Sequence, residues 1–290
     1  MNNLYDETKF LMRKYNISAN KNLGQNFLID ENVVNSIVEK SNICKDDLVI
    51  EIGPGLGTLT NRLLEKAKKV IAIELDERML KILKERFFMY DNFEIINEDV
   101  LKVDLKKIIE INKEKENINS VKVVANLPYY ITTPIIMKLL EDRLDLESIT
   151  VMIQKEVADR ICEIPGGKNT GAITYAIYYY AEAEKILTVP NDSFIPEPEV
   201  TSEVIKLKIR KNPPVQIQNE ELLFKIIKAA FMQRRKTLSN ALINSKIFES
   251  KQEIEKCFEE IKVEKNIRGE KLTLEQFNEI AKYIENKNIM

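Results

Sequence analysis

The sequence predicts an α/β fold: a mostly parallel sheet with helices on both faces, followed by a small helical domain. Over residues 47–154, short runs rich in β-branched residues alternate with longer amphipathic segments, which is typical of a parallel sheet. Two further strand candidates follow this region, and an Asn-Pro-Pro sequence at 212–214 then interrupts the pattern. Beyond this interruption the periodicity is helical throughout.

Five segments of the first region have the length and β-branched content of buried strands. They are Asp47–Gly53, Val70–Asp76, Phe93–Asp99, Val121–Leu127 and Ile149–Gln154. The helices predicted between them are Leu59–Lys68, Glu77–Phe87, Leu105–Ile111 and Pro134–Arg143, the last with Thr132 and Thr133 as capping residues. Because such crossovers join parallel strands, the two faces of the sheet both carry helices.

The pattern changes after Gln154. Two helices, Lys155–Ile164 and Ala172–Ala181, precede strand candidates at Lys185–Val189 and Val200–Arg210 that we expect to form an antiparallel hairpin at the sheet edge. The later helices are predicted at Glu220–Phe231, Arg235–Ile243, Lys251–Glu260 and Thr273–Asn286. The predicted domains are therefore residues 1–211 and 212–290.

Charge is unevenly distributed along the chain. The net charge of the 290 residues is only −2, yet residues 206–246 hold ten basic and two acidic residues, about +8, which leaves about −10 for the rest. Such a basic segment indicates one surface that could meet nucleic acid.

Several classes of site and location are disfavoured by the composition. Cys44, Cys162 and Cys257 are far apart and form no C-x-x-C pair, so we expect neither disulfides nor a metal site. No signal sequence or apolar run of membrane-spanning length is evident, which favours a cytoplasmic protein. The sequence contains no histidine, which excludes the commonest general base.

A glycine-containing loop follows the first strand. Gly53 and Gly55 lie in the sequence EIGPGLG, and Glu74 ends the second strand about twenty residues later. Glycines allow a ligand to approach the backbone, and a carboxylate at that distance accepts hydrogen bonds from ribose hydroxyls. The pattern favours a nucleoside cofactor over a simple tight turn. It lacks the third glycine position of the dinucleotide fingerprint.

Two further polar residues end strands at the same edge. Asp99, after the third strand, is placed to accept from an adenine amino group, although a solvated acid or a helix cap explains it equally well. Asn126-Leu127-Pro128-Tyr129 ends the fourth strand, at the carboxyl edge where open α/β sheets bind ligands. A strand-terminating turn with a core tyrosine is the alternative interpretation of this tetrapeptide.

The tetrapeptide suits methylation of an adenine amine. The side-chain oxygen of Asn126 and the carbonyl of Leu127 can hold both hydrogens of an exocyclic amine, which makes its nitrogen more nucleophilic. Pro128 stiffens the turn, and Tyr129 offers a ring on which the extruded base stacks. The methylated nitrogen can lose its proton to water, so catalysis rests mainly on alignment.

Six motifs in order resemble the ribosomal RNA adenine dimethyltransferases, which modify two neighbouring adenines near the 3′ end of small-subunit RNA. They are Asn22-Leu23-Gly24-Gln25-Asn26-Phe27-Leu28, the glycine loop, Ile73-Glu74-Leu75-Asp76, Asn126–Tyr129, Phe194-Ile195-Pro196-Glu197-Pro198 and Gln233-Arg234-Arg235-Lys236-Thr237-Leu238. The resemblance covers nearly the whole chain. It implies a Rossmann-like sheet of the class I methyltransferases and S-adenosylmethionine as the methyl donor.

The resemblance also implies roles for particular residues. Positions that match Asn26, Leu28, Gly53, Glu74, Asp99 and Asn126 contact the donor in that family, and the segment before the sheet acts as a lid. Phe194 matches a residue that flanks the target base, although without the family it is better explained as a core aromatic. The implied partner is small-subunit RNA in an immature 30S particle, and we expect a monomer.

Three alternatives remain open. The erythromycin-resistance enzymes, which act on large-subunit RNA, share the donor site and the asparagine motif, but the segment Phe231–Asn240 resembles the small-subunit group. The protein could instead be mainly an assembly-checkpoint binder, or a dehydrogenase. The run Arg234-Arg235-Lys236 is expected to contact RNA phosphates, whereas its simpler explanation is a solvated helix start.

Overall fold

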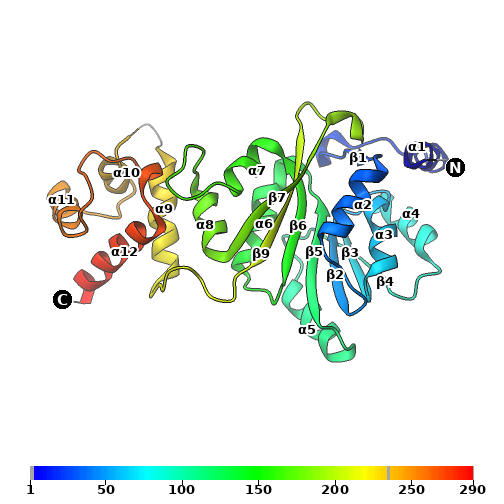
Figure 1. The fold of residues 1–290 in the computed structure, drawn as a ribbon, viewed down its shortest axis with the longest axis horizontal. Coiled ribbons are helices and arrows are strands. Elements are labelled where there is room, and N and C mark those ends of the chain that lie inside the picture. Colours follow the sequence, from blue (N-terminus) through cyan, green and yellow to red (C-terminus); the bar gives the residue numbers. More distant parts are fainter. Residues whose placement is uncertain (1–2, 234–235, 290) are drawn as a thin grey trace. The chain divides into compact units, whose positions relative to one another are not determined.

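The computed structural model describes residues 3–233 and 236–289. Its main sheet has seven strands in the order β4-β3-β2-β5-β6-β9-β7 (Figure 1). The neighbours among β2 to β6 pair in parallel, and β9 pairs antiparallel to β6, which confirms the predicted mixed sheet. The strands are β2 Asp47–Ile52, β3 Lys69–Glu74, β4 Phe93–Asn97, β5 Ser120–Asn126, β6 Ser148–Gln154, β7 Ala181–Val189 and β9 Ser202–Ile209.

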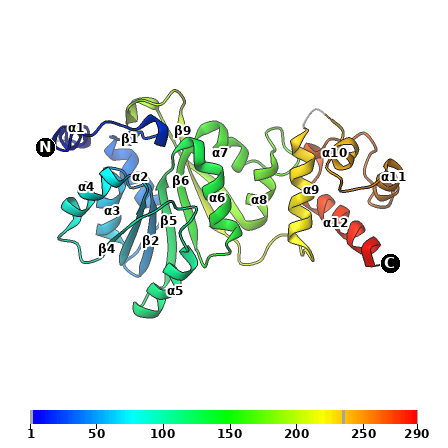
Figure 2. The ribbon, with the colours of Figure 1, turned by 180° about the vertical axis from the view of Figure 1, so that it is seen from behind.

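Helices cover both faces of this sheet. The buried side chains of α2 (Glu31–Lys40), α3 (Thr58–Lys66) and α4 (Glu77–Phe87) join strand residues such as Val49 and Val70 in one core cluster. Figure 1 shows α2 and α3 in front of the sheet, and Figure 2, from behind, shows α6 (Thr132–Glu141) on the opposite face. The remaining crossover helix, between β4 and β5, is α5 (Leu105–Lys115).

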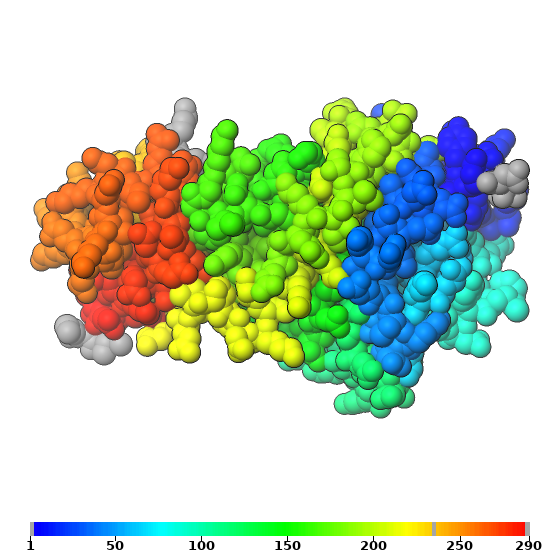
Figure 3. Space-filling view, viewed as in Figure 1, coloured from blue at the N-terminus to red at the C-terminus, as the bar shows by residue number. Residues whose placement is uncertain are grey.

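Two α-helices and one short strand of the N-terminal segment were not predicted from the sequence. Asn3 caps helix α1 (Leu4–Lys14), and Asp30 caps α2. Strand β1 (Phe27–Leu28) pairs antiparallel with β8 (Phe194–Ile195) in a separate two-stranded sheet. In the space-filling view the dark-blue side chains of α1 lie next to the cyan segment that contains α4 (Figure 3).

The predicted cap of helix α6 was wrong. The helix begins at Thr132 itself, after the 3-10 turn Tyr129–Ile131, and the residue before it makes no side-chain cap. The Thr132 hydroxyl donates to the Pro128 carbonyl, at 3.1 Å. The 3-10 turn leads directly into the helix, so the helix begins two residues before Pro134. The prediction had placed Pro134 at the first helical position, where proline is common.

The chain forms two compact units. One contains the residues up to Ala158 together with Ala183–Ile209, and the other contains Asp159–Glu182 and the residues from Arg210 onward. This division differs from the predicted one, because residues 159–182 group with the C-terminal helices. The helices not yet named are α7 Lys155–Ile161, which crosses the division, α8 Ala172–Tyr180, α9 Glu220–Met232, α10 Leu238–Asn244, α11 Lys251–Glu260 and α12 Leu274–Ile289.

Tyr175 of α8 explains why that helix belongs to the second unit. Its hydroxyl donates to the Leu272 carbonyl, at 2.6 Å, and its ring meets Phe277 edge to face. A buried tyrosine needs such a hydrogen-bond partner, and sequence periodicity does not indicate where the partner lies.

Among the residues that the structure describes, no helix is long and apolar enough to span a membrane.

Candidate active site

A pocket lies at the carboxyl ends of the parallel strands. Strands β2 and β5 are neighbours at the point where the strand order reverses, which is where open α/β sheets bind ligands. The pocket holds about 1060 Å³ of empty space, including its open mouth. Among its lining residues are the six expected donor contacts, Gly55 of the glycine loop and the asparagine tetrapeptide: Asn26, Leu28, Gly53, Gly55, Glu74, Asp99, Asn126, Leu127, Pro128 and Tyr129.

The glycine loop faces this pocket with its backbone exposed to the ligand space. Gly53 and Gly55 have φ angles of +67° and +57°, which L-residues with side chains rarely adopt. No atom lies within 4 Å of the position that a Cβ of Gly53 would take. The Gly55 amide donates to Oε2 of Glu74, at 3.1 Å, so the loop is tied to the end of β3.

Glu74 is buried, with 6% of its surface exposed. Its Oε1 accepts from the Asp76 amide, at 2.8 Å. Burial raises the pKa of Glu74, and the hydrogen bonds from the Asp76 and Gly55 amides partly oppose this rise. A carboxylate has about four acceptor sites, so both oxygens retain capacity for the hydroxyls of a sugar.

Glu51 lines the same pocket, although no sequence pattern indicated a role for it. Its carboxyl is buried and accepts from the Thr60 hydroxyl, at 2.6 Å. Burial raises the pKa of Glu51 to about 8, the Thr60 hydrogen bond opposes the rise, and the nearby Glu74 carboxylate adds to it. At neutral pH the group is therefore mostly protonated.

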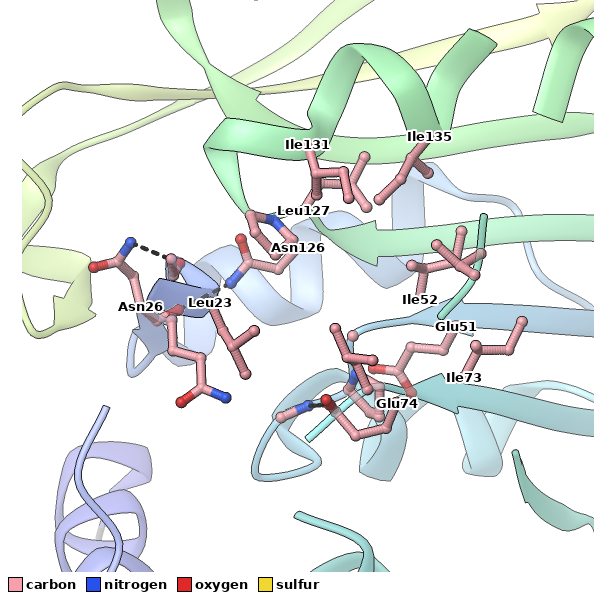
Figure 4. A pocket seen from close by; sticks show the side chains of 18 of the residues that line it. Leu23, Asn26, Glu51, Ile52, Ile73, Glu74, Asn126, Leu127, Ile131 and Ile135 are labelled. Carbon is pink, nitrogen blue, oxygen red and sulfur yellow. Dashed lines mark hydrogen bonds between the residues drawn. The ribbon is translucent and has the colours of Figure 1, made fainter. Parts of the chain in front are cut away.

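Asn126 reaches into the pocket from the end of β5, beside Leu23 and Asn26 of the segment before the sheet (Figure 4). Its Nδ2 donates to the main-chain oxygen of Asn26, at 3.1 Å. This hydrogen bond fixes the orientation of the Asn126 amide, so its Oδ1 is available as an acceptor for another group. The Leu127 amide donates to the Met152 carbonyl, at 3.1 Å, which fixes the backbone where its own carbonyl follows.

The two aromatic candidates lie in different places. Tyr129 lines the pocket half-buried, and its hydroxyl shares a hydrogen bond with that of Ser202, at 2.6 Å. Phe194 does not line this pocket: it is 2% exposed, pairs with Leu28 between β8 and β1, and belongs to the core cluster. This placement is that of the core aromatic, so contact between Phe194 and a base stays a prediction.

The segment before the sheet is joined to the pocket edge by Gln25, for which no sequence pattern indicated a role. Its Nε2 donates to Oδ2 of Asp76, at 2.8 Å. Burial alone would raise the pKa of Asp76, but hydrogen bonds from Arg78 and Gln25 outweigh it and hold the pKa below its usual value. No spacing rule links two polar residues 51 positions apart, so sequence patterns gave no signal for this pair.

The expected RNA contacts are only partly described. Lys236 is exposed, just before the Thr237 cap of α10. Arg234 and Arg235 lie outside the described residues.

Comparisons with known proteins agree over almost the whole chain. The family model described as "Ribosomal RNA adenine dimethylase" matches residues 16–286. The ribosomal RNA small subunit methyltransferase A of Lachnoclostridium phytofermentans is 49% identical over 283 residues, 97% of each chain. The protein of the same name from Clostridium acetobutylicum is 48% identical over 274 residues, 94% of this chain and 96% of that one.

A solved structure supports the same relationship. The crystal structure of a dimethyladenosine transferase from Plasmodium falciparum superposes with a TM-score of 0.74 at 25% identity, over 90% of this chain and 98% of that chain. The pocket, the ordered motifs and the family match lead to one conclusion: the chain belongs to the ribosomal RNA adenine dimethylase family.

Proposed function

We propose that this protein transfers methyl groups from S-adenosylmethionine to N6 of two adjacent adenines near the 3′ end of small-subunit (16S) ribosomal RNA. The observation that carries the proposal is the orientation of Asn126. Its amide nitrogen is bound to Asn26, so its oxygen is available at the pocket that Glu74 and the glycine loop also line.

The residues present fit the donor. The empty space beside Gly53 accommodates a ligand that lies against the loop, and the Glu74 carboxylate accepts from its ribose hydroxyls. Asp99 uses Oδ1 to accept from the Leu101 amide, at 3.0 Å, and its second oxygen suits an adenine amino group. S-Adenosylmethionine, when bound, supplies an electrophilic methyl group. The family of this chain uses this donor.

The target amine would be held by main-chain and side-chain oxygens. Oδ1 of Asn126 and the carbonyl of Leu127 accept its two hydrogens, which localises the nitrogen lone pair. The ring of Tyr129, held through its hydroxyl at Ser202, stacks on the extruded base. Alignment of this kind needs no general base, and the chain has no histidine.

The RNA is bound by positive charge outside the pocket. We assign phosphate contact to Arg234, Arg235 and Lys236, which lie in the basic stretch 206–246. A base must leave its stack to enter the pocket, so the substrate is looped RNA in an immature 30S particle rather than duplex. Assembly of such particles places the protein in the cytoplasm, where we expect it to act as a monomer, with residues 212–290 serving RNA recognition.

The proposal is tested by offering labelled donor with unmethylated small subunits, large subunits or naked RNA. We expect N6,N6-dimethyladenosine, identified by mass spectrometry, only with small subunits. Modification of large subunits would indicate the erythromycin-resistance activity instead. Asn126→Ala should abolish transfer while it still binds small subunits, and unchanged transfer by this variant would refute the role of Asn126.

A further inference from the structure

We propose that Tyr130 forms a second base-binding subsite at the pocket mouth, which stacks the nucleobase next to the adenine being methylated. This inference rests on the proposed function and adds a specificity residue to it. The occupant of this subsite is a nucleobase, a purine by preference.

The two neighbouring tyrosines differ in what holds them. Tyr129 is half-buried, and its hydroxyl is bound to Ser202. Tyr130 also lines the pocket, but 58% of its surface is exposed. The two residues open the 3-10 turn Tyr129–Ile131, where successive side chains point about 120° apart. The ring of Tyr129 therefore lies inside the site, and the ring of Tyr130 lies at its entrance.

The exposed ring is nevertheless supported on one side. Cδ1 and Cε1 of Tyr130 lie 3.3 and 3.5 Å from the position that a Cβ of Gly24 would occupy. Gly24 has a φ of +58°, so glycine suits this position for its backbone and for the room that it leaves the ring. The segment before the sheet thus backs Tyr130, and the rest of the ring faces solvent.

A supported, exposed aromatic ring beside a base pocket fits the chemistry of the substrate. When one of two adjacent adenines is extruded, its neighbour loses a stacking partner. Proteins that bind single-stranded nucleic acid replace such contacts with aromatic side chains on which successive bases stack. Tyr129 and Tyr130 are consecutive, so the chain presents one ring for each of two consecutive bases.

The competing explanation is that Tyr130 only clamps Gly24 and so closes the donor site. Tyr130→Leu separates the two, because leucine keeps an apolar contact with Gly24 but cannot stack on a base. We expect this variant to raise KM for unmethylated small subunits about tenfold, with kcat and the Kd for S-adenosylmethionine unchanged. Tyr130→Phe, which keeps the ring, should behave as the wild type.

A direct measurement replaces one of the two adjacent adenines at a time with 2-aminopurine in reassembled small subunits. This base lacks the 6-amino group that Asn126 and Leu127 hold, so the remaining adenine occupies the methylation pocket and the probe lies next to it. Stacking on Tyr130 should quench its fluorescence with the wild-type protein and with Tyr130→Phe, but not with Tyr130→Leu. Equal quenching by all three proteins, or a weaker donor Kd with unchanged KM in Tyr130→Leu, would overturn the subsite. Failure of the wild type to methylate unmodified small subunits would instead overturn the proposed function, and the subsite with it.

Discussion

Asn126 donates a hydrogen bond from Nδ2 to the main-chain oxygen of Asn26, at 3.1 Å, although the two residues are 100 positions apart. A carbonyl oxygen accepts but does not donate, so this bond decides which end of the Asn126 amide is free. The segment before the sheet therefore orients the oxygen assigned to the target amine. The position of this segment and the orientation of the Asn126 amide are therefore coupled through one hydrogen bond.

Asn126→Asp should be nearly as inactive as Asn126→Ala. Aspartate keeps an acceptor oxygen at the pocket, but its carboxylate has no hydrogen to donate to Asn26 and repels that carbonyl. We expect single-turnover methyl transfer to fall about 100-fold or more, as for other small misplacements of a reacting group. Wild-type rates in Asn126→Asp would show that the Asn26 contact has no part in catalysis.

Gln25→Ala should weaken donor binding about tenfold, because the segment loses its hydrogen bond to the Asp76 carboxylate. Limited proteolysis should also cut faster within residues 16–26. Lys21→Ala is the matched control, since Lys21 is an exposed residue of the same segment. Calorimetric titration with S-adenosylmethionine measures the effect. Equal donor affinities of Gln25→Ala and Lys21→Ala would show that Gln25 does not contribute to donor binding.

The strands and the pocket edge were predictable because they depend on local patterns. Buried parallel strands such as β2 are short segments rich in β-branched residues, and helix α4 begins and ends at the predicted residues. Polar residues that end such strands meet at one edge for topological reasons. Glu74 and Asn126 were therefore found from the sequence together with the pocket that they share.

What the sequence did not reveal depends on contacts between distant segments. The Gln25–Asp76 and Tyr175–Leu272 hydrogen bonds join residues 51 and 97 positions apart, and no periodicity encodes them. The second of these explains why α8 belongs with the C-terminal helices. Likewise the depth at which Phe194 is buried follows from the pairing of two two-residue strands, which are too short to recognise from sequence.

Arg86→Met should destabilise the fold by about 2 kcal/mol. The side chain of Arg86 is only 15% exposed, and its guanidinium donates to the carboxylate of Glu7 on α1 and to the Leu56 carbonyl of the glycine loop. Its loss leaves both acceptors without this partner. Arg62→Met is the control, because Arg62 pairs with Glu31 and Glu65 at the surface, where such pairs contribute at most about 1 kcal/mol. Urea unfolding that shows equal losses would contradict this assignment.

Glu51 should make the stability of the protein fall as the pH rises. The pKa of Glu51 is raised from 4.5 to about 8 by folding, so between these values the unfolded chain has released a proton that the folded chain retains. The free energy of unfolding is therefore lower at pH 8 than at pH 4.5, by up to a few kcal/mol. Glu51→Gln keeps an acceptor for Thr60 and should remove this decline.

The measurement for Glu51 is urea unfolding from pH 5 to 9 without donor, in wild type, Glu51→Gln and Glu65→Gln. Glu65 is exposed on the same helix that carries Thr60, so its replacement should leave the slope of stability against pH as in the wild type. Parallel curves for all three proteins would show that Glu51 ionises in the folded protein with an ordinary pKa.

Replacement of Arg234, Arg235 and Lys236 by glutamine should reduce the salt dependence of small-subunit binding. If each residue neutralises one phosphate, the slope of log affinity against log salt becomes shallower by about two to three. The control replaces Lys251, Lys256 and Lys262, three exposed lysines outside the basic stretch, and produces the same change in net charge. A general effect of charge would alter both slopes equally, whereas direct phosphate contact alters only the first. If the two triple variants show equal slopes, residues 234–236 make no direct phosphate contact and are only the solvated start of a helix.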